Sequence, residues 1–164
     1  ASIKLAELAP VGKKWKLLTM ASIPSPANWM SNQKANSSLV VSDIIKLCKE
    51  AGVHGRRVVI ALTEEQVSSH IIELPTMEDA EVEQALQWQV EQYIPMPLDQ
   101  AVWSYQIVRR DTVGNGGIEV LVAAVAKSLV EFYRSVAESS GLEVLALETE
   151  LMSTARSVFP ANPQ

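Results

Sequence analysis

The chain contains few of the residues from which covalent and metal sites are usually built. It has one cysteine, Cys48, and two histidines among 164 residues. One cysteine cannot form a disulfide within the chain, and it fits a reducing compartment. Neither His54 nor His70 has a second histidine or cysteine at metal-site spacing. We therefore expect no metal site and interpret both histidines as surface or hydrogen-bonded side chains.

Motifs of catalysis and phosphate binding are also missing. The sequence has no G-x-S-x-G, no Walker A motif and no G-x-G-x-x-G. Cys48 lies on the apolar side of an expected helix and is interpreted as a core thiol. The acidic pairs, such as Glu64 with Glu65, fit loops and a helix start better than acid–base chemistry. The sequence predicts no catalytic residues.

Net charge and the length of the apolar runs argue against two further classes of protein. The net charge of −5 argues against nucleic-acid binding, which requires clustered lysine and arginine. The short basic run of Lys13, Lys14 and Lys16 is most simply a solvated strand edge. No apolar run reaches the ~18 residues that span a bilayer, and no signal peptide is visible. We therefore expect a soluble, cytoplasmic protein.

Hydrophobic periodicity predicts an α+β (α/β) fold in the order β-β-α-β-β-α-β-β-α-β-α. The run 58–62 is continuously apolar and is predicted as a central strand buried on both faces. Gly114 to Gly117 is predicted as the turn of an antiparallel hairpin. The remaining strands are expected near 3–8, 15–20, 67–74, 101–109, 118–126 and 142–147, and the helices near 38–51, 77–94, 128–140 and 151–159.

Two of these helices carry more detailed predictions. In the helix near 38–51, the apolar stripe is predicted at Val41, Ile44, Ile45 and Cys48. The next helix is predicted to begin at Met77, after a capping box formed by Thr76 and Asp79. Its apolar stripe contains Val82, Leu86 and Tyr93, and Pro95 ends it.

The aromatic residues after this stripe are the most informative feature for function. Trp88 and Tyr93 are predicted on or beside one helix face, and Trp103 and Tyr105 share one face of the next strand. The corner from Tyr93 to Leu98, with Pro95 and Pro97, joins helix and strand. These aromatics are either ordinary core or the lining of a groove for an extended peptide, and both interpretations stay open.

Several segments of the sequence match, in order, the motifs of one known protein family. The segment from Leu86 to Asp99, LQWQVEQYIPMPLD, is similar to the W-E-x-E-x-Y-I-P-F-P-x-x-E motif of the PilM family of type IV pilus assembly proteins. The strand WSYQIV, from Trp103 to Val108, resembles the family's L-D-Y-Q-V-L. Further matches are VVIAL at Val58, IIELP at Ile71, VLVAA at Val120 and EVLALETE at Glu143.

The resemblance implies a fold related to the cell-division protein FtsA. An actin-like (ribonuclease H-like) subdomain 1A would be interrupted by a small SHS2-like subdomain, 1C. The expected division is partial subdomain 1A at 1–65, 1C at 66–142, and a return to 1A at 143–164. The chain is interpreted as an excised fragment or a short natural protein, and these alternatives stay open.

Ser2 and Lys4 resemble the tail of the family's D-x-G-[ST] phosphate loop, whose aspartate and glycine are absent here. The second half of the actin-like fold is also absent. The resemblance therefore implies a non-enzyme that needs no cofactor, although full-length relatives have an ATP and magnesium site. A nucleotide-hydrolysing enzyme is the contrasting alternative.

The resemblance also implies a role and a partner. PilM acts on the cytoplasmic face of the bacterial inner membrane and captures the cytoplasmic tail of the membrane protein PilN between 1A and 1C, so this chain would meet the membrane only indirectly. Other platform proteins, an assembly ATPase and self-association are further expected interactions. The alternative is a type II secretion L-type protein that recruits a secretion ATPase. The expected partner-binding residues are Trp88, Tyr93, Ile94, Pro95, Pro97 and Tyr105, although a purely structural corner remains open.

Overall fold

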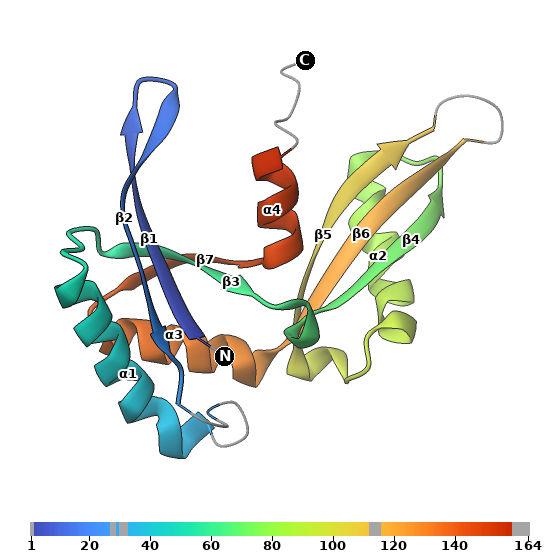
Figure 1. Ribbon diagram of the computed structural model, residues 1–164. Helices are drawn as coiled ribbons and strands as arrows, with labels where there is room; N and C mark the ends of the chain where they lie inside the picture. The colour runs from blue at the N-terminus through green and yellow to red at the C-terminus, as the bar shows by residue number, and fades with distance from the viewer. Residues whose placement is uncertain (1, 27–28, 30–32, 112–115, 159–164) are drawn as a thin grey trace. The chain divides into compact units, whose positions relative to one another are not determined.

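The computed structural model describes residues 2–26, 29, 33–111 and 116–158. Strands and helices alternate along the chain much as the sequence predicts, giving a mixed α+β fold (Figure 1). The chain divides into two compact units, one formed by residues 1–60 and 131–147, the other by residues 61–130 and 148–164. We call them unit 1 and unit 2. The predicted subdomain boundaries stay a prediction.

Unit 1 begins with a long antiparallel hairpin. Strand β1 (Ser2–Val11) pairs with β2 (Lys14–Pro24). Gly12 closes the turn with a φ of 61°, a left-handed conformation that glycine adopts without steric cost. The register shifts between Glu7 and Leu8, so one residue of β2 is left over as a bulge. The two predicted strands are confirmed, and both are longer than predicted.

Most residues of a second strand pair and of two helices also belong to unit 1. Strand β3 (Arg57–Leu62) lies in a two-stranded sheet with β7 (Glu143–Thr149), and α3 (Lys127–Ser139) precedes β7. The prediction that 58–62 is buried on both faces is wrong, because Val59 is 53% exposed. The strand is not central either, because the described sheet that contains it has two strands.

Helix α1 (Gln33–Glu50) begins earlier than predicted and turns a slightly different stripe inward. Among the side chains of α1 that the structure describes, Val40 and Leu47 are buried, whereas Ile45 is 47% exposed. The stripe is therefore rotated by about one residue from the predicted set. Gly52 follows the helix with a φ of 66°, as expected for a glycine that ends a helix.

Unit 2 contains one helix packed on a three-stranded antiparallel sheet. Strand β6 (Gly117–Ala126) lies between β4 (Ser68–Pro75) and β5 (Ala101–Arg110). Helix α2 (Asp79–Tyr93) buries Val82, Leu86 and Val90 completely. These side chains form one core cluster with inward residues of the strands, namely Ile72, Leu74, Ile118, Val120, Val122 and Ala124.

Helix α2 starts two residues later than predicted. The backbone N–H of Glu78 donates to the Glu81 side chain at 3.1 Å, so Glu78 rather than Thr76 is the residue before the first turn. Thr76 instead donates its hydroxyl to the Gly116 carbonyl at 2.7 Å. A side chain used to fasten the end of the β5–β6 hairpin is not available to cap the helix. The predicted capping box is therefore wrong.

The last element is helix α4 (Glu150–Val158), which belongs to unit 2. In the described parts of the chain, no helix combines the length and the apolar character needed to cross a membrane.

Candidate partner-binding surface

The corner between α2 and β5 is built from alternating inward and outward side chains. Ile94 is 6% exposed and lies in the core of unit 2, and Met96 and Leu98 pack against the same core. Pro95 and Pro97 between them are exposed. The corner is therefore an extended segment that three apolar side chains attach to the core. Its two prolines restrict the φ angles of the backbone.

Backbone hydrogen bonds close the corner at both ends. The N–H of Ile94 donates to the Val90 carbonyl at 3.1 Å, completing the last turn of α2. Pro97 has φ −56° and ψ 141°, and its carbonyl accepts from Gln100 at 3.0 Å in the short helix η2 (Leu98–Gln100). The predicted structural role of this corner is thus visible in its packing and hydrogen bonds.

Aromatic side chains gather on the α2 side of the sheet, near this corner. Tyr93 is 40% exposed, and its ring centroid lies 5.8 Å from that of His70. On the other edge strand, Trp103 and Tyr105 are half-buried with centroids 6.5 Å apart. His70 and Tyr105 both pair with the same central residue, Val122. We call His70, Tyr93, Trp103 and Tyr105 the aromatic row.

His70 is the member of the aromatic row that sequence analysis did not recognise. It precedes Ile72 and Leu74 at intervals of two, so all three point to the α2 side of β4. Its Nε2 lies 3.2 Å from the Ser68 hydroxyl oxygen. The alternation of His70, Ile72 and Leu74 in the sequence is the signal that could have placed His70 on the α2 side of the sheet.

Trp88 lies apart from the aromatic row. Its side chain is 83% exposed, whereas Leu86 and Val90 on either side of it are completely buried. At 100° per residue, Trp88 points away from the sheet and Tyr93 points back toward it. The prediction that Trp88 and Tyr93 share a helix face is therefore wrong.

The far side of the unit 2 sheet is partly apolar and exposed. Ile71 is 60% exposed on β4 and Val102 is 45% exposed on β5. Their alternation with inward residues places both on the face opposite α2. The outer strands β4 and β5 also have one edge each without a strand neighbour in the described sheet.

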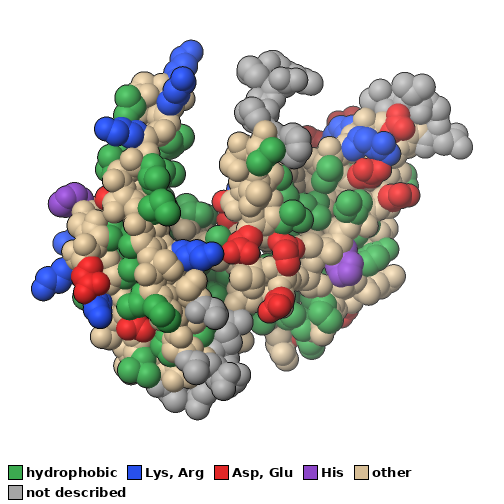
Figure 2. Space-filling model, viewed as in Figure 1, with side chains coloured by type: hydrophobic (Ala, Val, Ile, Leu, Met, Phe, Trp, Pro, Cys, Tyr) green, Lys and Arg blue, Asp and Glu red, His purple; other side chains and the backbone are tan. Residues whose placement is uncertain are grey.

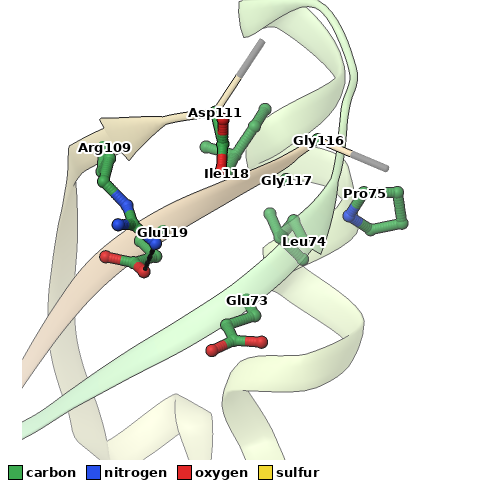
Figure 3. A pocket seen from close by; sticks show the side chains of 9 residues that line it. All are labelled: Glu73, Leu74, Pro75, Arg109, Asp111, Gly116, Gly117, Ile118 and Glu119. Carbon is green, nitrogen blue, oxygen red and sulfur yellow. Dashed lines mark hydrogen bonds and ion pairs between the residues drawn. The ribbon is translucent and has the colours of Figure 1, made fainter. Parts of the chain in front are cut away.

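A pocket lies around the β5–β6 hairpin, at the end of the unit 2 sheet that is farther from the α2–β5 corner (Figure 3). Two of its charged residues, Arg109 and Glu119, form an ion pair at 2.5 Å. Gly116 allows a close approach there, because an added Cβ would lie 2.2 Å from the Asp111 carbonyl oxygen. The pocket is lined by Glu73, Leu74, Pro75, Arg109, Asp111, Gly116, Gly117, Ile118 and Glu119.

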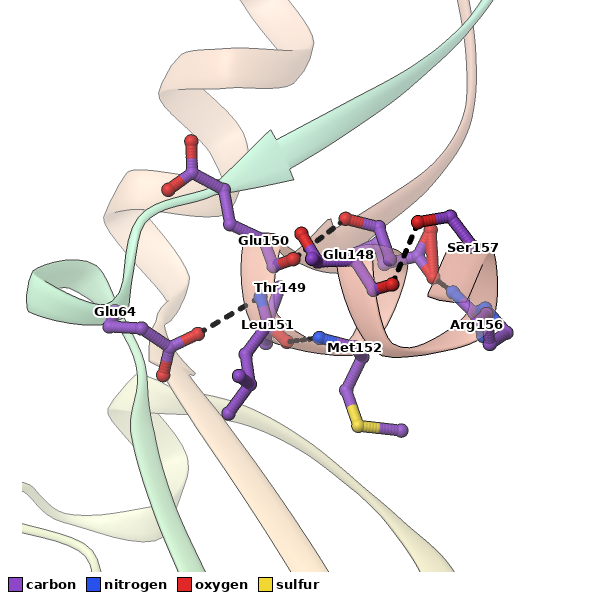
Figure 4. A network of polar contacts seen from close by, with 10 residues as sticks. Glu64, Glu148, Thr149, Glu150, Leu151, Met152, Arg156 and Ser157 are labelled. Atoms are coloured by element: carbon purple, nitrogen blue, oxygen red, sulfur yellow. Dashed lines mark hydrogen bonds and ion pairs between the residues drawn. The ribbon is translucent and has the colours of Figure 1, made fainter. Parts of the chain in front are cut away.

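Polar contacts also hold α4 in place (Figure 4). The Glu64 carboxylate accepts a hydrogen bond from the Leu151 N–H at 3.3 Å, and Glu148 forms an ion pair with Arg156. The Thr149 hydroxyl accepts from the Met152 N–H at 3.1 Å, at the first turn of the helix. These carboxylates therefore have structural partners in α4, Glu64 at its first turn and Glu148 at its last turn.

Cys48 is the one thiol of the chain, and its surroundings do not activate it. Burial, and secondarily the nearby Glu7 carboxylate, raise the pKa of the Cys48 thiol. A nucleophilic cysteine needs the opposite shift. Among the residues that the structure describes, no group of three or more metal-ligating side chains comes together.

Ser2 and Lys4 lie at the start of β1, exposed and on the same face of the strand. They stand opposite Pro24 and Ser22 in the regular ladder of the hairpin. A role of these two residues in phosphate binding stays a prediction.

The fold resembles solved structures from two secretion-related systems. Over 96% of this chain and 47% of that chain, it matches a structure of a PilM–PilN type IV pilus biogenesis complex, with a TM-score of 0.82 and 28% identity. It also matches the cytoplasmic domain of EpsL, an inner membrane component of the type II secretion system of Vibrio cholerae. That match has a TM-score of 0.55 and 14% identity, covering 90% of this chain and 52% of that one, and it shows a shared fold.

The chain thus spans about half the length of the structures that it matches. A sequence model for one family, described as type IV pilus assembly protein PilM, matches residues 1–161. This match covers nearly the whole chain and agrees with the structural similarity, so the resemblance seen in the sequence is confirmed. The chain belongs to the PilM family of type IV pilus assembly proteins.

Proposed function

We propose that the chain is an interaction module of a type IV pilus assembly platform and binds the N-terminal cytoplasmic tail of a PilN-like membrane protein. One observation carries this proposal. The chain resembles, at 28% identity over 96% of its length, a protein whose structure was solved as a PilM–PilN complex. The proposed location is the cytoplasmic face of the inner membrane, because the N-terminal tail of such a membrane protein lies there.

The aromatic row is the part of unit 2 best suited to an extended peptide. Tyr93 and His70 stand at the β4 edge, and Trp103 and Tyr105 at the β5 edge. Tyrosine and tryptophan are enriched among residues that dominate binding energy, because they bury a large area with few rotatable bonds. A free strand edge supplies backbone hydrogen bonds to a peptide lying beside it.

The corner at Pro95 and Pro97 keeps this surface in a fixed shape. Ile94 is buried, so in this proposal it anchors the corner rather than contacting the tail. A surface that is already ordered loses less conformational entropy on binding. A partner contact at Trp88 is a separate hypothesis, since that side chain points away from the aromatic row.

The test is binding of a fluorescent peptide with the sequence of the cognate PilN tail. The wild-type chain should bind saturably, and Tyr93→Ala should weaken binding by roughly tenfold, as for an aromatic residue at the centre of an interface. The affinity of Tyr105→Ala shows whether the peptide also contacts the β5 edge, since Tyr93 lies beside β4. Trp88→Ala is the matched control, because it removes an exposed aromatic from the opposite side of α2.

Circular dichroism establishes that each variant is folded. Equal affinity of wild type, Tyr93→Ala and Tyr105→Ala would remove the aromatic row from the proposal. Absence of any binding by the folded wild-type chain would contradict the proposed partner.

The proposed module has no enzymatic role. Nucleotide at 100 times its dissociation constant would stabilise a binding protein by roughly 2.7 kcal/mol. We therefore expect no rise in melting temperature with millimolar ATP and magnesium. A clear rise would favour a nucleotide-dependent activity instead.

A further inference from the structure

Helix α2 carries a tryptophan on the side that faces away from the sheet. Trp88 is 83% exposed, more than any other large hydrophobic side chain that the structure describes. An indole ring offers a large apolar area with few rotatable bonds, and tryptophan is enriched among the residues that dominate binding energy. The fold of unit 2 makes no use of this side chain, so we examined what surrounds it.

The neighbours of Trp88 on the helix surface are acidic or amide side chains. At 100° per residue, the positions seven and four before Trp88, and three and four after it, lie within about 60° of it around the helix axis. These positions hold Glu81, Gln84, Glu91 and Gln92, and all four are exposed. We call these four residues and Trp88 the outer face of α2.

The negative charge of the outer face is not compensated. Helix α2 contains no lysine or arginine, and within the described parts of the chain neither Glu81 nor Glu91 forms an ion pair. Charges are mixed elsewhere in unit 2. Figure 2 shows basic and acidic side chains side by side at the far end of β5 and β6, where Arg109 pairs with Glu119. The outer face therefore combines an apolar centre with carboxylates that lack a cationic partner.

We infer that the outer face of α2 docks an arginine-bearing segment of a basic protein partner. A guanidinium group stacks on the face of an indole ring, because the ring's π electrons attract the cation. Glu91 is one helical turn beyond Trp88, about 4.5 Å along the axis, within reach of the same guanidinium. Glu81, about 10.5 Å before Trp88, is placed for a second cationic side chain of that segment.

The charge of the outer face disfavours the other classes of partner. Nucleic acids and anionic phospholipids carry the same sign of charge as Glu81 and Glu91, so this face would repel them. A second copy docked through the same face would bring two sets of carboxylates together. For a basic protein, the same carboxylates accelerate association and fix orientation. The inference does not depend on the PilN proposal, because the outer face points away from the aromatic row.

The test is titration of the 164-residue chain with a labelled synthetic helical peptide that has leucines on one face and arginines on the other. Fluorescence anisotropy gives the dissociation constant. Trp88→Ala should weaken binding roughly tenfold, as for an aromatic residue at the centre of an interface. A peptide with lysine in place of arginine should bind several-fold more weakly, because an ammonium group lacks the planar surface that stacks on indole. A glutamate peptide should not bind.

A double variant, Glu81→Gln with Glu91→Gln, should weaken binding and reduce its salt dependence. Glutamine at position 81 still accepts from the Glu78 N–H, so the start of α2 is preserved. The matched control is Glu65→Gln with Glu73→Gln. It removes the same charge from exposed positions in η1 (Glu64–Gln66) and on the sheet face opposite α2, and its affinity should equal that of wild type.

Trp15→Ala controls for the loss of an exposed indole, since Trp15 is 70% exposed in unit 1, and it should bind the arginine peptide as wild type does. Circular dichroism verifies the fold of every variant. No binding of the arginine peptide, or equal affinity of wild type and Trp88→Ala, would overturn the inference. Equal losses in the two double variants would do so as well, because attraction to a chain of net charge −5 would then suffice. So would a stable dimer, measured by light scattering, that Trp88→Ala dissociates.

Discussion

The corner at Ile94 and Pro95 allows two neighbouring residues to be compared in one experiment. Ile94 is 6% exposed in the core of unit 2, and Pro95 beside it is exposed. Ile94→Ala removes three buried carbons but keeps the N–H that donates to Val90. Such truncations destabilise by the lost transfer free energy and by the cavity left behind, about 2–5 kcal/mol.

Pro95→Ala should act mainly through the unfolded chain. It removes no buried contact and only restores conformational freedom, so we expect a loss of about 0.4–1 kcal/mol. Urea unfolding followed by far-ultraviolet circular dichroism measures the unfolding free energy of both variants. With a slope of about 1–3 kcal/mol per molar urea, Ile94→Ala should lower the midpoint by roughly 1 M or more. Equal midpoints for the two variants would refute the reasoning that side chains at this corner alternate inward and outward.

Two further predictions concern other parts of the chain. Gly116→Ala should destabilise unit 2 by about 1–3 kcal/mol in urea unfolding, because a Cβ would lie 2.2 Å from the Asp111 carbonyl oxygen; a wild-type midpoint would contradict this packing. The pKa of Cys48 is raised by burial and by Glu7, so less thiolate is present at any given pH. Its alkylation rate should reach half-maximum at a higher pH in the native chain than in urea, and a lower native midpoint would contradict the described environment.

The elements of unit 2 were predictable because their local signals agree with their packing. Val82, Leu86 and Val90 repeat at helical spacing and are all completely buried. Both neighbours of β6 precede it in the chain, and the glycine-rich sequence between β5 and β6 favours their antiparallel pairing. Pro95 ends α2 as its effect on the preceding residue predicts.

The errors arose where a contact distant in sequence competes with a local signal. Thr76 has the sequence context of a helix cap, but the Gly116 carbonyl, 40 residues away, takes its hydroxyl. Val59 is in an apolar run that resembles a central strand, yet the strand lies in a two-stranded sheet. Sequence periodicity does not tell how many strands a sheet contains.

The candidate surface was predicted in part. The sequence singled out Tyr93 and Tyr105 through their family motif, and the structure places both on the α2 side of the sheet. It did not identify His70, which reaches Tyr93 only after β4 and α2 have packed together. It also placed Trp88 with Tyr93, although helical geometry turns the two side chains to different sides of α2.

The most direct test of the proposed function is the affinity of the chain for the cognate PilN tail, measured for wild type, Tyr93→Ala and Trp88→Ala. The account predicts saturable binding that Tyr93→Ala weakens about tenfold and Trp88→Ala leaves unchanged. Failure of the folded wild-type chain to bind the tail would contradict its role as a PilN-binding module.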